Sequence, residues 1–165
     1  MLTQFYGIRA QLQHIMEWPP HITVAAIAER DGKFLFVTEY IGGQLLLNQP
    51  AGHLDPGETL FDAVKRETLE ETGWRVEPSL VTGIYHYPSH HAGVVYHRIT
   101  FLVTLLELTD MPIDPAIDSV HWLSPAEMGA YTPRSPIVTR CLADYRQRGG
   151  FPLDLIAHLQ PQRAR

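Results

Sequence analysis

Runs of apolar and β-branched residues predict strands through most of the chain. His21–Arg30 and Lys33–Thr38 are separated by Asp31-Gly32, a dipeptide that favours a tight hairpin turn. Gln44–Asn48 is predicted as a short strand, and Gln49–Gly57 after it is predicted as turns. Three further strands are expected later in the chain, over Leu80–Tyr87, Val94–Leu108 and Asp118–Leu123.

Helical patterns occur in the middle of the chain and again near its end. Leu60–Thr72 has a helical period and is followed by Gly73, which suits the left-handed position after a helix. Ser124-Pro125-Ala126-Glu127 and Ser135-Pro136 each combine a serine cap with a proline at the first helical position. The second of these helices carries one apolar stripe: Ile137, Val138, Cys141, Leu142 and Tyr145. Strands first and helices later predict a mixed α+β layer fold.

The composition is that of one globular domain. The chain has 165 residues, of which 45% are hydrophobic and 19% charged, and we expect a single domain over residues 19–165. Met1–Trp18 is predicted to be an N-terminal extension that ends at Pro19-Pro20. The single cysteine, Cys141, excludes a disulfide framework within one chain. No apolar run is long enough to span a membrane and the start lacks a signal peptide's apolar centre, so we expect a cytoplasmic protein.

The negative charge is concentrated in one segment. The net charge is −5, and Asp55–Glu71 alone, with six acidic and two basic residues, contributes −4. This balance argues against nucleic acid as a partner. The segment includes the predicted central helix, where acidic side chains would not be expected on the buried stripe.

Two glutamates nevertheless continue that stripe. At 100° per residue, Leu60, Ala63 and Val64 lie within about 60° of the stripe's centre line, as a buried face requires. Glu67 and Glu71 fall on the same line, within about 20° of Leu60. The acidic residues therefore do not form a solvated face opposite the core.

This placement carries electrostatic costs that a bound cation would remove. Glu67 and Glu71 form a like-charge pair one turn apart, and Glu70 lies in the last turn, where the helix dipole favours cations. Mg²⁺ prefers such carboxylate oxygens and commonly shares its shell with phosphates. Alternatively, Arg66 forms ordinary surface ion pairs with Asp62 and Glu70. The helix alone leaves both interpretations open.

The residues from Gly52 to Glu58 and from Arg66 to Trp74 resemble the Nudix box, G-x5-E-x7-R-E-U-x-E-E-x-G-U, where U is a bulky apolar residue. Every fixed Gly, Glu and Arg is present, and the one departure is Thr68 at the first U position. The resemblance implies the Nudix fold, an α/β/α sandwich with a mixed β-sheet between helices. It also implies hydrolysis of a diphosphate linkage with Mg²⁺, or Mn²⁺, as cofactor.

A narrower resemblance extends over roughly Pro20 to Ile156 and points to the NudJ-type Nudix phosphatases. The segments that carry it include Pro20–Ala25, Asn48–Leu54, Arg134–Val138 and Phe151–Leu153. The resemblance implies hydrolysis of nucleoside tri- and diphosphates with release of orthophosphate. It also implies activity on the pyrophosphate of the thiamine pyrimidine precursor.

The resemblance assigns roles to individual box residues. It makes Glu67, Glu70 and Glu71 metal ligands, with Glu67 or Glu70 as the general base. Arg66 would orient these glutamates. Glu58 would support the loop or an outer metal, and the backbone carbonyl of Gly52, or of Ala51, would be an extra ligand.

Four residues are candidates for substrate binding. Arg98 lies in an otherwise apolar strand, where it would bind a phosphate or form a rim ion pair. His86 stands at a strand end, and Tyr85 would stack on a heterocycle or pack in the core. His53 lies within the box itself.

Two rival functions remain. Tyr87 and Pro88 lie downstream of the box, where subfamilies that cleave ADP-ribose or dinucleoside polyphosphates carry diagnostic Tyr or Pro residues. A non-catalytic nucleotide-binding Nudix module is the alternative of another class, although such modules usually lose box glutamates that are intact here. The expected partner is a small nucleotide or pyrophosphate, and the chain is expected to be a monomer or a homodimer.

Overall fold

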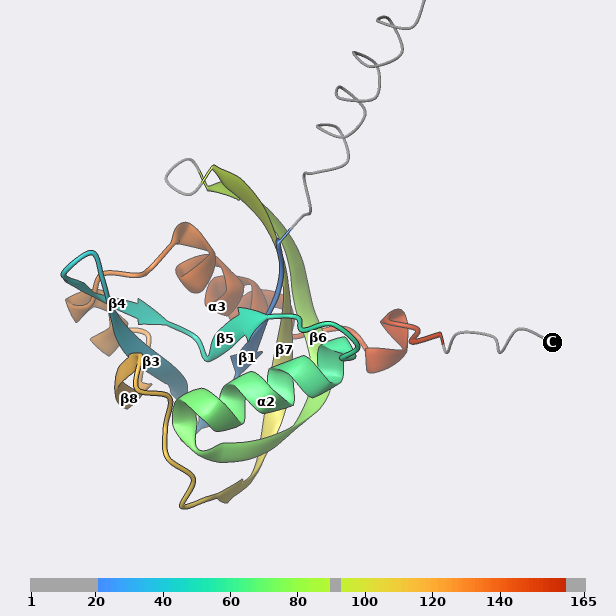
Figure 1. Ribbon diagram of the computed structural model, residues 1–165, viewed down its shortest axis with the longest axis horizontal. Helices are drawn as coiled ribbons and strands as arrows, with labels where there is room; N and C mark the ends of the chain where they lie inside the picture. The colour runs from blue at the N-terminus through green and yellow to red at the C-terminus, as the bar shows by residue number, and fades with distance from the viewer. Residues whose placement is uncertain (1–20, 90–92, 160–165) are drawn as a thin grey trace, which may run out of the picture.

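The structure, a computed structural model, describes residues 21–89 and 93–159 (Figure 1). The predicted extension, Met1–Trp18, lies outside the described residues. In chain order the strands are β1 (His21–Ile27), β2 (Glu29–Arg30), β3 (Lys33–Ile41), β4 (Gln44–Asn48), β5 (Ala51–His53), β6 (Trp74–Ser89), β7 (Val94–Leu108) and β8 (Ile117–Leu123). The helices are α2 (Leu60–Thr72) and α3 (Pro136–Arg148), with the 3₁₀ turns η1 (Glu127–Ala130) and η2 (Leu153–Leu155).

The first sheet is mixed and has the strand order β5-β1-β7-β6. β1 pairs in parallel with β7, so that Thr23 lies opposite Arg98. On its other side β1 pairs antiparallel with the edge strand β5, where Thr23 faces His53 and Val24 faces Gly52. This register places the first residues of the box one strand away from Thr23 and two strands away from Arg98.

The second sheet is built around β3, which pairs antiparallel with β2, β4 and β8. The predicted hairpin turn between β2 and β3 is confirmed, because Asp31 and Gly32 have positive φ angles of 54° and 73°. Phe34 and Phe36 of β3 are buried on the side that α3 covers, whereas Leu35 packs with the cluster under α2.

The two helices lie on opposite faces of the first sheet (Figure 1). Ala63 and Val64 of α2 pack against Phe101 and its neighbours on one face. Val138 and Leu142 of α3 pack with the cluster on the other face. The predicted α+β sandwich is therefore confirmed. Within the two described ranges, no helix combines the length and apolarity needed to cross a bilayer.

Several strand predictions have the wrong limits, and the predicted strand Lys33–Thr38 continues to Ile41. The predicted strand His21–Arg30 is interrupted at Ala28, because the chain leaves the first sheet there and enters the second. β6 begins at Trp74 instead of Leu80. It passes through Pro78, whose missing N–H is tolerated on an edge strand. The short strand β5 lies within Gln49–Gly57, where only turns are predicted.

The three predicted helix starts lead to helices of different lengths. α2 has the predicted bounds and ends at Gly73, which has a φ of 74° and donates to Leu69 O at 2.8 Å. Ser124 and Glu127 form reciprocal capping hydrogen bonds, but they support only the 3₁₀ turn η1. Ser135 occupies the N-cap position of α3, although its side chain makes no capping hydrogen bond.

Candidate active site

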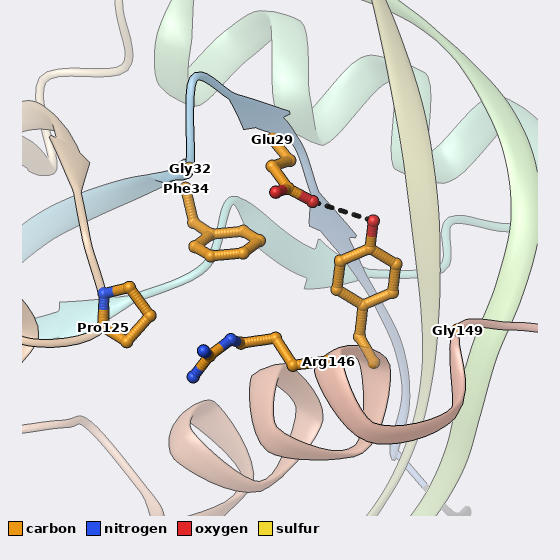
Figure 2. Close-up of a pocket in the computed structure, with 7 residues that line it drawn as sticks. Glu29, Gly32, Phe34, Pro125, Arg146 and Gly149 are labelled. Carbon is orange, nitrogen blue, oxygen red and sulfur yellow. Dashed lines mark hydrogen bonds between the residues drawn. The ribbon is translucent and has the colours of Figure 1, made fainter.

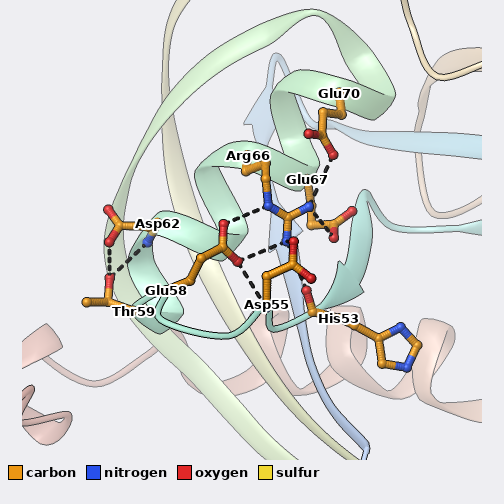
Figure 3. A network of polar contacts seen from close by, with 8 residues as sticks. All are labelled: His53, Asp55, Glu58, Thr59, Asp62, Arg66, Glu67 and Glu70. Atoms are coloured by element: carbon orange, nitrogen blue, oxygen red, sulfur yellow. Dashed lines mark hydrogen bonds and ion pairs between the residues drawn. The ribbon is translucent and has the colours of Figure 1, made fainter.

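Arg66, in the middle of α2, is the centre of a polar network that joins this helix to the loop after β5 (Figure 3). Its Nε and Nη2 donate to the two carboxylate oxygens of Glu58 at 2.7 and 3.0 Å, and Nη2 also donates to His53 O at 3.0 Å. Nη1 donates to Glu67 at 2.7 Å and to Glu70 at 3.1 Å. Arg66 thereby fastens the loop after β5 to the helix and holds two acidic side chains in place.

The edge strand β5 fits closely against the acidic face of α2. The N–H of Ala51 donates to Glu71 Oε2 at 2.8 Å. The Glu67 carboxylate lies over Gly52, where a Cβ atom would meet its oxygens at 2.1–2.2 Å. A side chain at position 52 would therefore displace Glu67, which explains why glycine is required next to this carboxylate.

The glutamate side chains of this network differ strongly in their exposure to solvent. The side chain of Glu67 is 13% exposed, whereas that of Glu70, on the flank of the stripe, is 46% exposed. Burial raises the pKa of the Glu71 carboxyl to about 8, against the opposing effect of the Ala51 N–H. Burial also raises the pKa of Glu67, against the opposing effect of Arg66. The hydrogen bonds from Arg66 lower the pKa of Glu58.

The donor set fits a hard divalent cation. In the part of the chain that the structure describes, no three acidic, histidine or cysteine side chains form a ready-made metal cage, and Arg66 instead neutralises the acidic group. Burial makes the negative charge of the Glu71 carboxylate costly, and the hydrogen bond from the Ala51 N–H offsets only part of this cost. Carboxylate and backbone oxygens beside a glycine are ligands that Mg²⁺ accepts.

A cleft of about 340 Å³ lies on the other side of β5. Ala51, Gly52 and His53 line it, so the strand that contacts Glu67 and Glu71 is also a wall of the cleft. Further walls are aromatic, apolar and cationic: Tyr87, Tyr96, Ile41, Leu46, Ile137, Arg98 and Arg134. The cleft and the acidic network are therefore adjacent, with β5 shared between them.

The structure brings two of the four predicted substrate residues to the cleft. His53 lies at its wall, within ring contact of His21 and Tyr96. Burial, together with the charges of His21 and Arg134, lowers the pKa of His53. Arg98 lies deeper, and only 8% of its surface is exposed.

The other two predicted residues are not at the cleft. Tyr85 packs against the cluster under α3, and its hydroxyl donates to Asp144 at 3.2 Å. His86 is exposed and makes an edge contact with the ring of His97, at 5.1 Å between centroids. Tyr85 and His86 are therefore not among the residues that line the cleft.

Several cleft residues lie outside the predicted set, and Tyr87, Tyr96 and Arg134 are those whose side chains could bind a nucleotide. Tyr87 follows His86 in the sequence and could, like Tyr85, be expected to stack on a heterocycle or to pack at the sheet edge. Tyr96 faces Tyr87 across the β6–β7 pair. Arg134 belongs to the run before α3 that carries the narrower resemblance, and this run is the only signal that could identify it.

A second hollow, of about 450 Å³, lies between the β2–β3 hairpin and α3 (Figure 2). Its wall includes Glu29, Phe34 and Arg146, and the Tyr145 hydroxyl donates to Glu29 at 2.9 Å. None of its described lining residues belongs to the acidic network. The candidate active site is therefore the cleft beside β5.

Comparison with known proteins agrees with this geometry. A family model described as the NUDIX domain matches residues 19–144. Phosphatase NudJ of Escherichia coli (strain K12) is 38% identical over 144 residues, which cover 83% of this chain and 90% of that protein. A solved NUDIX hydrolase from Nitrosomonas europaea has 40% identity and a TM-score of 0.83, covering 86% of this chain and 98% of its own. The chain therefore belongs to the Nudix family and is a hydrolase of phosphoanhydride bonds.

Proposed function

We propose that the protein is a Mg²⁺-dependent phosphatase of nucleoside tri- and diphosphates and of related small pyrophosphates, such as that of the thiamine pyrimidine. It would release orthophosphate by attack of water. The observation that carries this proposal is the position of Glu67 and Glu71 against β5, whose opposite side lines the cleft. The similarity to Phosphatase NudJ supports the choice of substrates.

The carboxylates of Glu67, Glu70 and Glu71 are the proposed metal ligands, with the carbonyl of Gly52 as a further ligand and Glu58 as a support. Nudix hydrolases generally use divalent metal ions. Such an ion neutralises phosphate oxygens and lowers the pKa of bound water. The same oxygen ligands also suit Mn²⁺.

The remaining steps belong to the protein's own side chains. Glu67, largely buried beside Gly52, is the proposed base that accepts a proton from the attacking water. Arg66 keeps Glu67 and Glu70 in position through the hydrogen bonds from its Nη1. Arg98 and His53 contact the substrate from the cleft wall. Positioning and charge thus perform most of the catalysis, and no nucleophilic side chain is required.

A substrate panel with Mg²⁺ or Mn²⁺ that resolves orthophosphate from pyrophosphate tests the proposal. We expect orthophosphate from ATP, ADP and the thiamine pyrimidine pyrophosphate. Glu67→Gln and Glu71→Gln should reduce turnover by orders of magnitude while the fold survives. Glu77→Gln is the matched control, because Glu77 forms a surface ion pair with Lys65 outside the site.

Other products would count against this assignment. Pyrophosphate from ATP, or AMP from ADP-ribose, would favour cleavage between inner phosphates. Tight nucleotide binding without turnover at any metal concentration would favour a non-catalytic module. Near-normal activity of both glutamine variants would refute the assigned roles.

A further inference from the structure

Arg134 is fixed at the cleft by its backbone. Its N–H donates to Leu47 O at 2.8 Å, and the N–H of Leu47 donates to Thr132 O at 2.8 Å. Pro133 forms an isolated parallel bridge with Leu47, so this loop extends the edge of β4. Substitution of the Arg134 side chain would leave these backbone hydrogen bonds in place.

The side chain of Arg134 is held by an acidic residue outside the box. Its Nη1 lies 2.7 Å from Glu39 Oε1. The Glu39 side chain is 15% exposed, against 44% for Arg134, and Asn48 Nδ2 approaches the same oxygen at 3.5 Å. A guanidinium carries five N–H donors on three nitrogens. The ion pair therefore orients Arg134 through one nitrogen while the residue lines the cleft.

A second cation, Arg98, lies in the same cleft, and its hydrogen-bond acceptors there are neutral. Arg98 donates to Gln49 Oε1 at 3.4 Å and to Asn48 Oδ1 at 3.3 Å, and both acceptors are amides. These contacts satisfy hydrogen bonds but do not neutralise the buried charge. Burial lowers the pKa of Arg98 and the positive charge of Arg134 lowers it further, against the opposing effects of Glu71 and Glu39. Both arginines line the cleft, and one polyanionic ligand bound there could accept charge-assisted hydrogen bonds from both.

We infer that Arg134, oriented by Glu39, binds the phosphate chain of the substrate together with Arg98. This inference rests on the proposed function and assigns roles to two residues outside the Nudix box. Arg134 is the substrate-binding residue, whereas Glu39 is a positioning residue that acts through it. The acidic network on α2 and the cationic wall would then hold the phosphate chain from the two sides of β5.

Steady-state kinetics with ATP separate these roles. Arg134→Gln should raise KM on the order of tenfold to a hundredfold, with kcat within about threefold, because a charge-assisted contact to phosphate is lost. Arg134→Lys should recover part of this loss. Arg148→Gln is the matched control, since Arg148 is half exposed and pairs with Asp144 at 3.0 Å away from the cleft. Its KM should equal that of the wild type.

The role of Glu39 is tested by a double-mutant cycle. Glu39→Gln should raise KM roughly three- to tenfold, and the Glu39→Gln/Arg134→Gln double variant should be no worse than Arg134→Gln alone. Additive losses in KM would overturn the positioning role. The double variant also removes both charges, so it remains a usable test if Arg134→Gln alone fails to fold.

Calorimetric titration of inorganic pyrophosphate into the metal-free protein tests binding without catalysis. Arg134→Gln should lose at least tenfold in affinity, and Arg148→Gln should lose none. Unchanged pyrophosphate affinity together with unchanged KM in folded Arg134→Gln would overturn the inference. A wild type that hydrolyses no diphosphate, but whose pyrophosphate affinity depends on Arg134, would refute the proposed function and leave this binding role standing.

Discussion

Replacement of Gly52 by alanine should displace the Glu67 side chain without changing the stability of the fold. The added Cβ would lie 2.1 Å from Glu67 Oε1. To reach an ordinary contact of 3.4 Å, the carboxylate would have to move by about 1.3 Å. The side chain of Glu67 is flexible, so this movement costs little folding energy, but it removes the carboxylate from its place beside β5.

The expected effects on activity and on stability differ in size. A displacement of about 1 Å in a catalytic group can reduce the rate on the order of a hundredfold, so kcat should fall by about that factor. The backbone of Gly52 lies outside the left-handed region, so alanine fits the strand. Alanine also leaves the unfolded chain fewer conformations than glycine does, which should stabilise the folded protein by about 0.4–1 kcal/mol and offset any strain. The melting temperature should therefore stay near that of the wild type.

The assay is orthophosphate release from ADP with Mg²⁺, combined with thermal unfolding. Gly129→Ala is the matched control, because a Cβ added at Gly129 would meet nothing within 4 Å and the φ of this residue is not left-handed. A folded Gly52→Ala protein with kcat within threefold of the wild type would refute the claim that Glu67 must lie against β5.

Three further predictions concern the proposed metal ligand Glu71, Thr68 at the apolar position of the box, and the capping residue Glu127. Mg²⁺ at about 100 times its Kd should stabilise the wild type by about 2.7 kcal/mol in thermal unfolding. Glu71→Gln, which keeps an acceptor for Ala51 N–H, should lose most of this gain; an undiminished gain would contradict the ligand role. Thr68→Val should change stability by less than about 1 kcal/mol and leave kcat unchanged, because the buried hydroxyl only donates back to Val64 O; a tenfold loss of kcat would contradict this. The hydrogen bond from the Ser124 N–H lowers the pKa of Glu127 to about 2. The ionised Glu127 carboxylate therefore stabilises the fold fully above pH 4.5, and this stabilisation is lost as the pH falls toward 2. The difference in urea unfolding between wild type and Glu127→Gln should therefore shrink over that range, and a constant difference would show that the charge does not matter.

The central helix and its acidic stripe were predictable because both depend on local periodicity. The bounds of α2 follow from its apolar positions and from Gly73. Glu67 lies inward because it shares a helical face with Val64, and Glu70 is more exposed because it flanks that face. Thr68 is fully buried, as the apolar position that it occupies in the box requires.

The cleft was less predictable because it depends on which strands become neighbours. Alternation along β6 places Tyr85 and His86 on opposite faces, but it does not reveal which part of either face lines the cleft. Tyr87 lines it, whereas Tyr85, on the same face, is covered by α3. Arg134 reaches the cleft only because its loop pairs with β4, a contact that no local pattern predicts.

The most direct test of the central claim is the anomalous scattering of Mn²⁺ in a crystal grown with a non-hydrolysable nucleotide. We predict a Mn²⁺ peak at roughly 2.1 Å from carboxylate oxygens of Glu67 and Glu71, the distance expected for a small hard cation. Glu67 would then exchange at least part of its contact with Arg66 for the ion. A bound nucleotide with no anomalous peak at these carboxylates, and with Arg66 still engaged as in Figure 3, would contradict the account.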